Sequence, residues 1–224
     1  IIRLSEDALT KARRLAESSE TTVRIGTSLL YKCRLLPDLW TRISEKHPEL
    51  KIEILPMTEY QNRGEVFSAL GVKFDLFEGI YGSGGWNGLC QFLELERTPI
   101  CCAVSRNHRL AGMKKLTMQD LNGEYLVMPV EGVSKEIDAF RKNVTEHYPT
   151  VQIVDSPYYG VDTFTLCEMN DYILVTQPVY ADIHSNLVTI PLETNYSLPY
   201  GLMYAKEPTS ASRKFINTIK EMVY

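Results

Sequence analysis

The sequence lacks several features that would point to a particular class of protein. Its 224 residues contain no CxxC pair, no apolar run long enough to span a membrane, and no excess of positive charge. A net charge of -4 argues against a surface that grips the phosphate backbone of DNA. Without CxxC there is no pattern for a zinc site, and we expect neither a metal nor another cofactor.

The cysteines do not have the pattern of a disulfide framework. They are five, an odd number, and irregularly spaced: Cys33, Cys90, Cys101, Cys102 and Cys167. This indicates a reducing compartment and predicts a cytoplasmic protein. Cys101 and Cys102 lie in an apolar run and are expected to pack as small hydrophobic side chains, with redox sensing as the alternative. No signal peptide is recognisable, and since the first residue is Ile1 rather than methionine, we expect a further N-terminal segment.

What is present is an alternation of helix and strand signals. Apolar residues at helical spacing predict a helix over residues 1–17, with no obvious domain to cover its apolar stripe. Strands follow near residues 23–26, 51–55 and 74–77, separated by helices that begin near Leu29 and Tyr60. This order implies a parallel sheet with right-handed crossovers.

A second α/β lobe is predicted further along the chain. A strand near residues 89–95 precedes this lobe, and further strands are expected near residues 98–104, 125–128, 151–154, 172–175, 187–190 and 199–205. Helices are expected over residues 134–147, 161–169, 178–184 and 210–224. Two α/β lobes joined by more than one crossing segment are typical of a binding cleft with a hinge.

The glycine-rich stretch at residues 82–88 suggests a nucleotide-binding loop but does not fit one. Its spacing is not GxGxxG, no Lys-Ser or Lys-Thr follows, and the next segment is patterned as a strand. The stretch therefore predicts a flexible loop.

Short motifs resemble the effector-binding domains of bacterial LysR-type transcriptional regulators. They are VRIG at 23–26, LLPDL at 35–39, HP at 47–48, FDL at 74–76, NHRLA at 107–111 and LTMQDLNGE at 116–124. They occur in the order of the family and extend the resemblance over essentially the whole chain. Three places depart from it: Arg109 replaces the usual proline, residues 170–176 lack the usual glycines, and the glycine-rich loop at residues 82–88 is not expected from the family pattern.

The resemblance implies the type II periplasmic binding protein fold, an α/β fold of two Rossmann-like lobes joined by two crossover segments. Lobe I is then expected at residues 22–97 and 192–224, and lobe II at 98–191. Residues 1–21 would end a linker helix that pairs with a partner subunit, and the winged helix-turn-helix that contacts DNA is absent from this chain. The resemblance also implies a homodimer or dimer of dimers whose geometry responds to a small-molecule effector bound in the inter-lobe cleft.

The predicted effector contacts follow from one rule. Ligands of open α/β sheets lie beyond the carboxyl ends of the strands, near helix N-termini. The residues at such places are Thr27, Ser28, Gly79, Tyr81, Pro129, Val130, Glu131, Tyr159, Gly160, Val161, Asp162 and Thr176.

Structural roles compete with ligand contact at these positions. Ser28 is also placed to cap the following helix, and Gly160 to make a turn. The charge of the ligand stays open, because helix N-termini favour a carboxylate whereas Glu131 and Asp162 would repel one or select a cation.

Two other functions fit a two-lobed fold. An extracytoplasmic solute-binding protein would share it, but the odd free cysteines and the leading helix argue against that class. An enzyme is not expected, because the four histidines lack a spaced Ser or Cys partner: His47, His108, His147 and His184.

Overall fold

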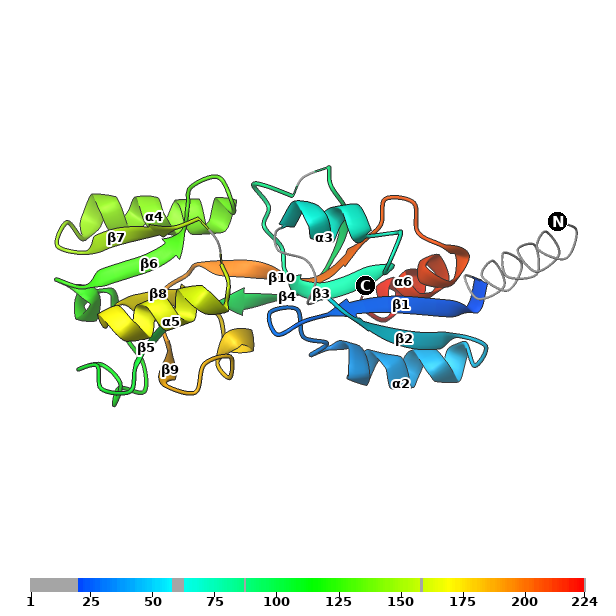
Figure 1. Cartoon of the computed structure of the whole chain (residues 1–224), viewed down its shortest axis with the longest axis horizontal. Helices are drawn as coiled ribbons and strands as arrows, with labels where there is room; N and C mark the ends of the chain where they lie inside the picture. Colours follow the sequence, from blue (N-terminus) through cyan, green and yellow to red (C-terminus); the bar gives the residue numbers. More distant parts are fainter. Residues whose placement is uncertain (1–19, 58–62, 87, 158, 224) are drawn as a thin grey trace, which may run out of the picture. The chain divides into compact units, whose positions relative to one another are not determined.

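The computed structural model describes residues 20–57, 63–86, 88–157 and 159–223. The helix predicted over residues 1–17 lies outside the described residues. Within the described part, strands and helices alternate in the predicted order (Figure 1).

The chain folds into two compact units built from discontinuous stretches of sequence. Unit 1 contains residues 1–79, 88–93 and 202–224, and unit 2 contains residues 80–87 and 94–201. Two strands, β4 (Gln91–Pro99) and β10 (Ser197–Tyr204), continue from one unit into the other. More than one segment therefore crosses between the units, as the pattern of the sequence implies.

The unit boundaries differ from the expected lobe boundaries at three places. Residues 80–87, 94–97 and 192–201 were expected in lobe I, whereas they belong to unit 2. Strand periodicity does not reveal where a continuous strand leaves one core and enters another, because its alternation is the same on both sides of that point.

Unit 1 is built on a sheet with the strand order β2-β1-β3-β10-β4. Strand β1 pairs in parallel with β2 and with β3, as the predicted strand–helix order requires. Helix α6 packs against β1 and α2 (Figure 1). The remaining bounds in this unit are β1 (Thr22–Thr27), α2 (Leu36–Lys46), β2 (Lys51–Pro56), α3 (Arg63–Ala69), β3 (Leu76–Ile80) and α6 (Ser210–Val223).

Helix α2 begins at Leu36, so the prediction of a helix from about Leu29 was wrong at its start. Residues 28–35 form a loop, and Pro37 stands in the first turn, where its fixed φ and missing N–H are tolerated. Apolar residues in this loop extended the helical pattern past the point where the backbone turns.

Unit 2 has its own sheet, with the order β7-β6-β8-β5-β9. Strand β6 pairs in parallel with β7 and β8, and β5 pairs antiparallel with β8 and β9. Helix α4 is capped by Ser134, whose Oγ accepts from Ile137 N, and it buries Phe140 completely in the core. The bounds are β5 (Cys101–Ser105), β6 (Tyr125–Pro129), α4 (Lys135–His147), β7 (Gln152–Ser156), α5 (Val161–Asn170), β8 (Ile173–Thr176) and β9 (Leu187–Pro191).

Three predicted elements need correction. The strands expected at 89–95 and 98–104 are instead β4, which runs to Pro99, and β5, which starts at Cys101. The helix expected at 178–184 is only a 3-10 turn over Pro178–Tyr180.

Candidate functional site

The loop after β1 closes on the backbone of Tyr31. Thr27 Oγ1 and the backbone N of Ser28 both donate to Tyr31 O, at 2.9 and 3.1 Å. Ser28 Oγ accepts from Tyr31 N at 3.2 Å. Ser28 therefore caps this turn and not helix α2, which corrects its predicted structural role.

Helix α2 is capped instead by Glu78, which the sequence analysis did not single out. Its carboxylate accepts hydrogen bonds from the backbone N–H groups of Arg34, Leu35 and Leu36 at 2.8–3.1 Å. Glu78 has no exposed surface. A buried acidic residue in an otherwise apolar strand was a signal of this role in the sequence.

Gly79 lies beside the ring of Tyr31, a second residue that the sequence reasoning missed. A Cβ atom at position 79 would lie 3.0 Å from Tyr31 Cδ1 and 3.4 Å from Met203 Cε. The Tyr31 ring also makes an edge contact with Phe77, at 5.0 Å between centroids. Thr27, Ser28 and Gly79 are thus brought together around Tyr31 at the carboxyl ends of β1 and β3.

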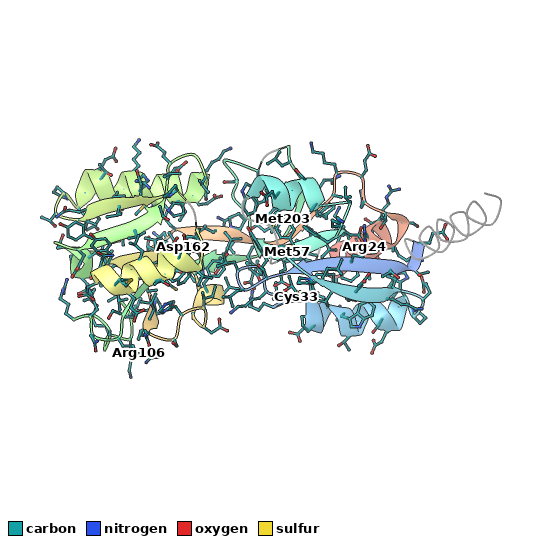
Figure 2. All side chains as sticks on the ribbon, in the orientation of Figure 1. Arg24, Cys33, Met57, Arg106, Asp162 and Met203 are labelled. Carbon is teal, nitrogen blue, oxygen red and sulfur yellow. The ribbon has the colours of Figure 1, made fainter. Side chains whose placement is uncertain are left out.

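Cys33 lies in the same loop of unit 1 (Figure 2). Burial raises the pKa of its thiol, and the charge of Glu78 adds to that rise, while a hydrogen bond with Thr27 opposes it. The side chains of Thr27, Cys33 and Glu78 therefore lie close together near the carboxyl ends of β1 and β3.

In unit 2, two of the predicted effector contacts, Tyr159 and Thr176, are hydrogen-bonded to each other. Tyr159 OH donates to Thr176 Oγ1 at 2.7 Å, and Thr176 is completely buried. The Tyr159 ring contacts Phe164 and Tyr180, with centroids 5.6 and 5.4 Å away. Desolvation raises the pKa of Tyr159, so its hydroxyl remains a neutral donor.

The N-terminus of α5 carries further hydroxyl groups. Thr163 Oγ1 accepts from Gly160 N at 3.3 Å and lies 3.3 Å from Ser156 Oγ. Val130 N in turn donates to Ser156 O at 3.1 Å. We call Ser156, Tyr159, Thr163 and Thr176 the hydroxyl cluster.

Gly160 lies next to the side chain of Asp162. A Cβ atom at position 160 would overlap the Asp162 carboxylate, which is at the exposed start of α5 (Figure 2). The exposed Asp162 side chain can turn away, so this contact alone does not require a glycine, but the carboxylate does bring a negative charge to the N-terminus of α5.

The other predicted contacts have different surroundings. Pro129 O accepts from Arg141 Nη2 at 2.6 Å, and Tyr81 contacts Trp86 edge-on with centroids 5.7 Å apart. Glu131 and Val161 are exposed. Glycines and strand ends in a sequence do not separate these positions from true ligand contacts, because they indicate the backbone geometry and not the direction of the side chain.

The glycine-rich loop has definite contacts, in contrast to the flexible loop that was predicted. Ser83 Oγ donates to Glu136 Oε2 at 2.7 Å and accepts from Lys135 N at 3.1 Å. A Cβ atom at Gly84 would overlap the carbonyl oxygen of Gly132. The loop is therefore docked, backbone against backbone, at the start of α4.

The departures from the LysR pattern have structural roles. Arg109 donates to Glu124 Oε1 at 2.6 Å and to Asp120 O at 2.7 Å, which ties its turn to the next segment. Asp171 takes the left-handed conformation at the end of α5, with φ of 55°. Tyr172 stacks on Tyr125 at 5.0 Å between ring centroids, so its ring packs against β6.

The four other cysteines are buried free thiols. Burial raises the pKa of Cys90 and Cys101 to about 11 and that of Cys167 to about 12, and it also raises the pKa of Cys102. Buried thiols with raised pKa values are poor nucleophiles, which favours packing over redox sensing.

The described residues also bear on metal binding and on membrane-spanning helices. Across the described ranges, no group of three or more His, Cys, Asp or Glu side chains is arranged to hold a metal ion. None of the described helices has the length and apolar character needed to cross a membrane.

Comparison with known proteins first defines the class of fold. The effector-binding domain of QuiR in complex with shikimate has a TM-score of 0.60 and 16% identity, over 91% of this chain and 97% of that one. CbnR, a LysR family transcriptional regulator, has a TM-score of 0.63 and 14% identity, over 100% and 77%. The effector-binding domain of BenM with its effector benzoate has a TM-score of 0.55 and 20% identity, over 91% and 92%. These likenesses confirm the expected type II periplasmic binding protein-like fold.

A family model then identifies the chain more closely. The model of the LysR substrate binding domain matches residues 16–223. The chain therefore belongs to the LysR substrate binding domain family. A search of curated proteins found no match.

Proposed function

We propose that this domain senses a small-molecule effector for a LysR-type transcriptional regulator. Each unit offers its own candidate contact region, which is the loop at residues 27–31 in unit 1 and the hydroxyl cluster in unit 2. The family match is the observation that carries this proposal. Related domains support it, since that of QuiR was solved with shikimate and that of BenM with benzoate.

The chemistry of the hydroxyl cluster suits recognition of a small polar molecule. Ser156, Thr163 and Thr176 are buried, and Tyr159 lies half-buried against aromatic rings. Hydroxyl groups both donate and accept hydrogen bonds, so they can exchange a partner within the cluster for one on a ligand. Apolar walls with a few convergent polar groups are typical of small-molecule sites.

Effector binding would act on transcription through a population shift. A ligand changes the balance between two conformations only by binding one more tightly than the other. We propose that the favoured conformation changes the geometry of a homodimer or dimer of dimers, and that DNA is contacted through a separate winged helix-turn-helix domain. The protein would act in the cytoplasm and without catalysis.

A thermal-shift screen against cytosolic metabolites tests this function. A ligand at a hundred times its Kd adds about 2.7 kcal/mol, which raises Tm by about 5 to 10 °C for a domain of this size. The Thr176→Val variant should bind the hit at least tenfold more weakly, because it loses a hydroxyl of the cluster. Thr165→Val is the matched control, since Thr165 is exposed on α5 and its hydroxyl donates only to the helix backbone at Val161.

The same experiment separates a sensor from an enzyme on this fold. A sensor returns the ligand unchanged after long incubation, whereas an enzyme converts it to product. Equal binding by wild type and Thr176→Val would place the effector away from the hydroxyl cluster and contradict the proposed site.

A further inference from the structure

Glu78 places a carboxylate inside unit 1 at the start of α2. Its Oε1 accepts from Arg34 N at 3.1 Å and from Leu35 N at 2.8 Å, and its Oε2 accepts from Leu35 N and Leu36 N, both at 3.1 Å. One side chain, with no exposed surface, thus engages three successive N–H groups.

Such a group of N–H donors is where an anion ordinarily binds. The first N–H groups of a helix have no partner within the helix, and the helix dipole favours negative charge there. In unit 1 this position follows β1, at the strand end where a ligand is expected. It is also adjacent to the predicted contacts, since Glu78 precedes Gly79 and its charge reaches Cys33 beside Thr27.

We propose that Glu78 is a specificity-determining residue that occupies the anion position of α2 in advance, so that the effector presents a neutral or cationic group to unit 1. This inference rests on the proposed function, because it assumes that an effector contacts the loop at residues 27–31. An incoming carboxylate would find the three N–H groups engaged and a charge of its own sign beside them. Shikimate and benzoate, which QuiR and BenM hold, are both carboxylates, so this domain would differ from theirs in the class of its ligand.

Chemical rescue tests whether Glu78 fills an anion site. Glu78→Ala removes the carboxylate, and its Tm should fall by about 5 to 10 °C because three N–H groups lose their acceptor. Sodium acetate at about 50 mM should restore about 2 to 5 °C in this variant by mass action, relative to sodium chloride of the same ionic strength. Acetamide, a neutral molecule of the same shape, should restore less than acetate.

Wild type and Glu45→Ala are the controls. Glu45 is exposed on the same helix and should lose little stability on substitution. Neither control should gain more from acetate than from chloride, since Glu78 fills the site in both. Equal effects of acetate and chloride on Glu78→Ala would overturn the inference, as would an equal gain from acetate in wild type.

If Glu78→Ala does not fold, a second measurement on the wild-type protein tests whether the N-terminus of α2 is open to an added anion. The amide resonances of Arg34, Leu35 and Leu36 in the wild-type protein are followed in ¹H–¹⁵N spectra during titration with acetate and then with benzoate. Unchanged positions relative to the chloride control support the inference. A saturable shift of all three resonances overturns it, because the anion site would then be open.

Failure of this inference is distinguishable from failure of the proposed function. Both tests use acetate or benzoate as simple anion probes and need no knowledge of the effector. A carboxylate effector bound at the N-terminus of α2 in wild type would support effector sensing and overturn the role of Glu78. Rescue of Glu78→Ala by acetate, with every ligand found in the thermal-shift screen converted to product, would support the role of Glu78 and contradict effector sensing.

Discussion

Arg24 and Asp75 form a buried link between β1 and the segment that leads into β3. Asp75 Oδ1 accepts from Arg24 Nη2 at 2.8 Å, and Oδ2 accepts from the backbone N of Arg24 at 2.8 Å and from its Nε at 3.3 Å. In return, Asp75 N donates to Arg24 O at 2.8 Å. Two motifs that are 51 residues apart in the sequence thus meet through both side chain and backbone.

Asp75→Ala should destabilise the protein by about 2 to 3 kcal/mol. The substitution leaves the buried Arg24 N–H without its carboxylate acceptor, although the guanidinium keeps some access to water, with 29% of the side chain exposed. Urea denaturation measures the loss. Glu49→Ala, which removes the exposed ion pair with Lys214, should cost much less stability than Asp75→Ala, and a similar loss in the two variants would contradict this account.

The hydrogen bond from Tyr159 to Thr176 should appear as an energetic coupling. Tyr159→Phe and Thr176→Val should each cost about 1 kcal/mol, since each breaks the same bond and leaves its partner unsatisfied. The double variant should therefore lose less stability than the sum of the two single losses. Urea denaturation of all four proteins gives the coupling, and strict additivity would mean that the hydroxyl groups do not interact.

Gly84→Ala should release the glycine-rich loop from α4, because the new methyl group would overlap the Gly132 carbonyl oxygen. Limited proteolysis should then cut within residues 82–88 at least several-fold faster than in wild type. Gly112→Ala is the matched control, as a Cβ atom at position 112 meets nothing within 4 Å. Equal cleavage rates in the two variants would show that the contact with Gly132 does not hold the loop.

The buried thiols should resist alkylation in the folded state. With a pKa of about 11, Cys90 and Cys101 should carry about 100-fold less thiolate at pH 8 than a thiol with the ordinary value of 9.0. Mass spectrometry after iodoacetamide treatment should show modification of half-buried Cys33 before either of them. Rapid labelling of Cys101 in the native protein would contradict its burial.

The same pKa shifts have a consequence for stability. Because the folded pKa of Cys90 and Cys101 lies above the unfolded value, the folded state holds its protons more tightly. The free energy of unfolding is then unaffected below about pH 9 and falls as the pH rises from about 9 towards about 11. Urea denaturation at pH 8 and pH 10 measures this fall, and substitution of both cysteines by alanine should reduce it.

The order and type of most elements were predictable from the sequence. Strands such as β1 and helices such as α4 carry their own periodicity, and Ser134 marks the start of α4 by a contact three residues away. The same local patterns, taken in order, supported the resemblance to the LysR family. The start of α2 was misplaced because apolar residues in a loop resemble one more helical turn.

The candidate site was only partly predictable. Strand ends and glycines marked Thr27, Gly79, Tyr159 and Thr176 as candidates, because such positions depend on the local backbone pattern. Their contact with an effector stays a prediction. The sequence gives no direct indication that Tyr159 OH reaches across 17 residues to Thr176, or that Ser83 docks on Glu136.

By itself, the sequence determined the fold class and the family, since both depend on periodicity and on short ordered motifs. Only the tertiary structure decided that Glu78, and not Ser28, caps helix α2. The hydrogen bonds that make this cap join residues that are 42 to 44 positions apart in the sequence. Contacts at such separations depend on strand order and side-chain direction. These arise when the sheet forms, and no local pattern of residues encodes them alone.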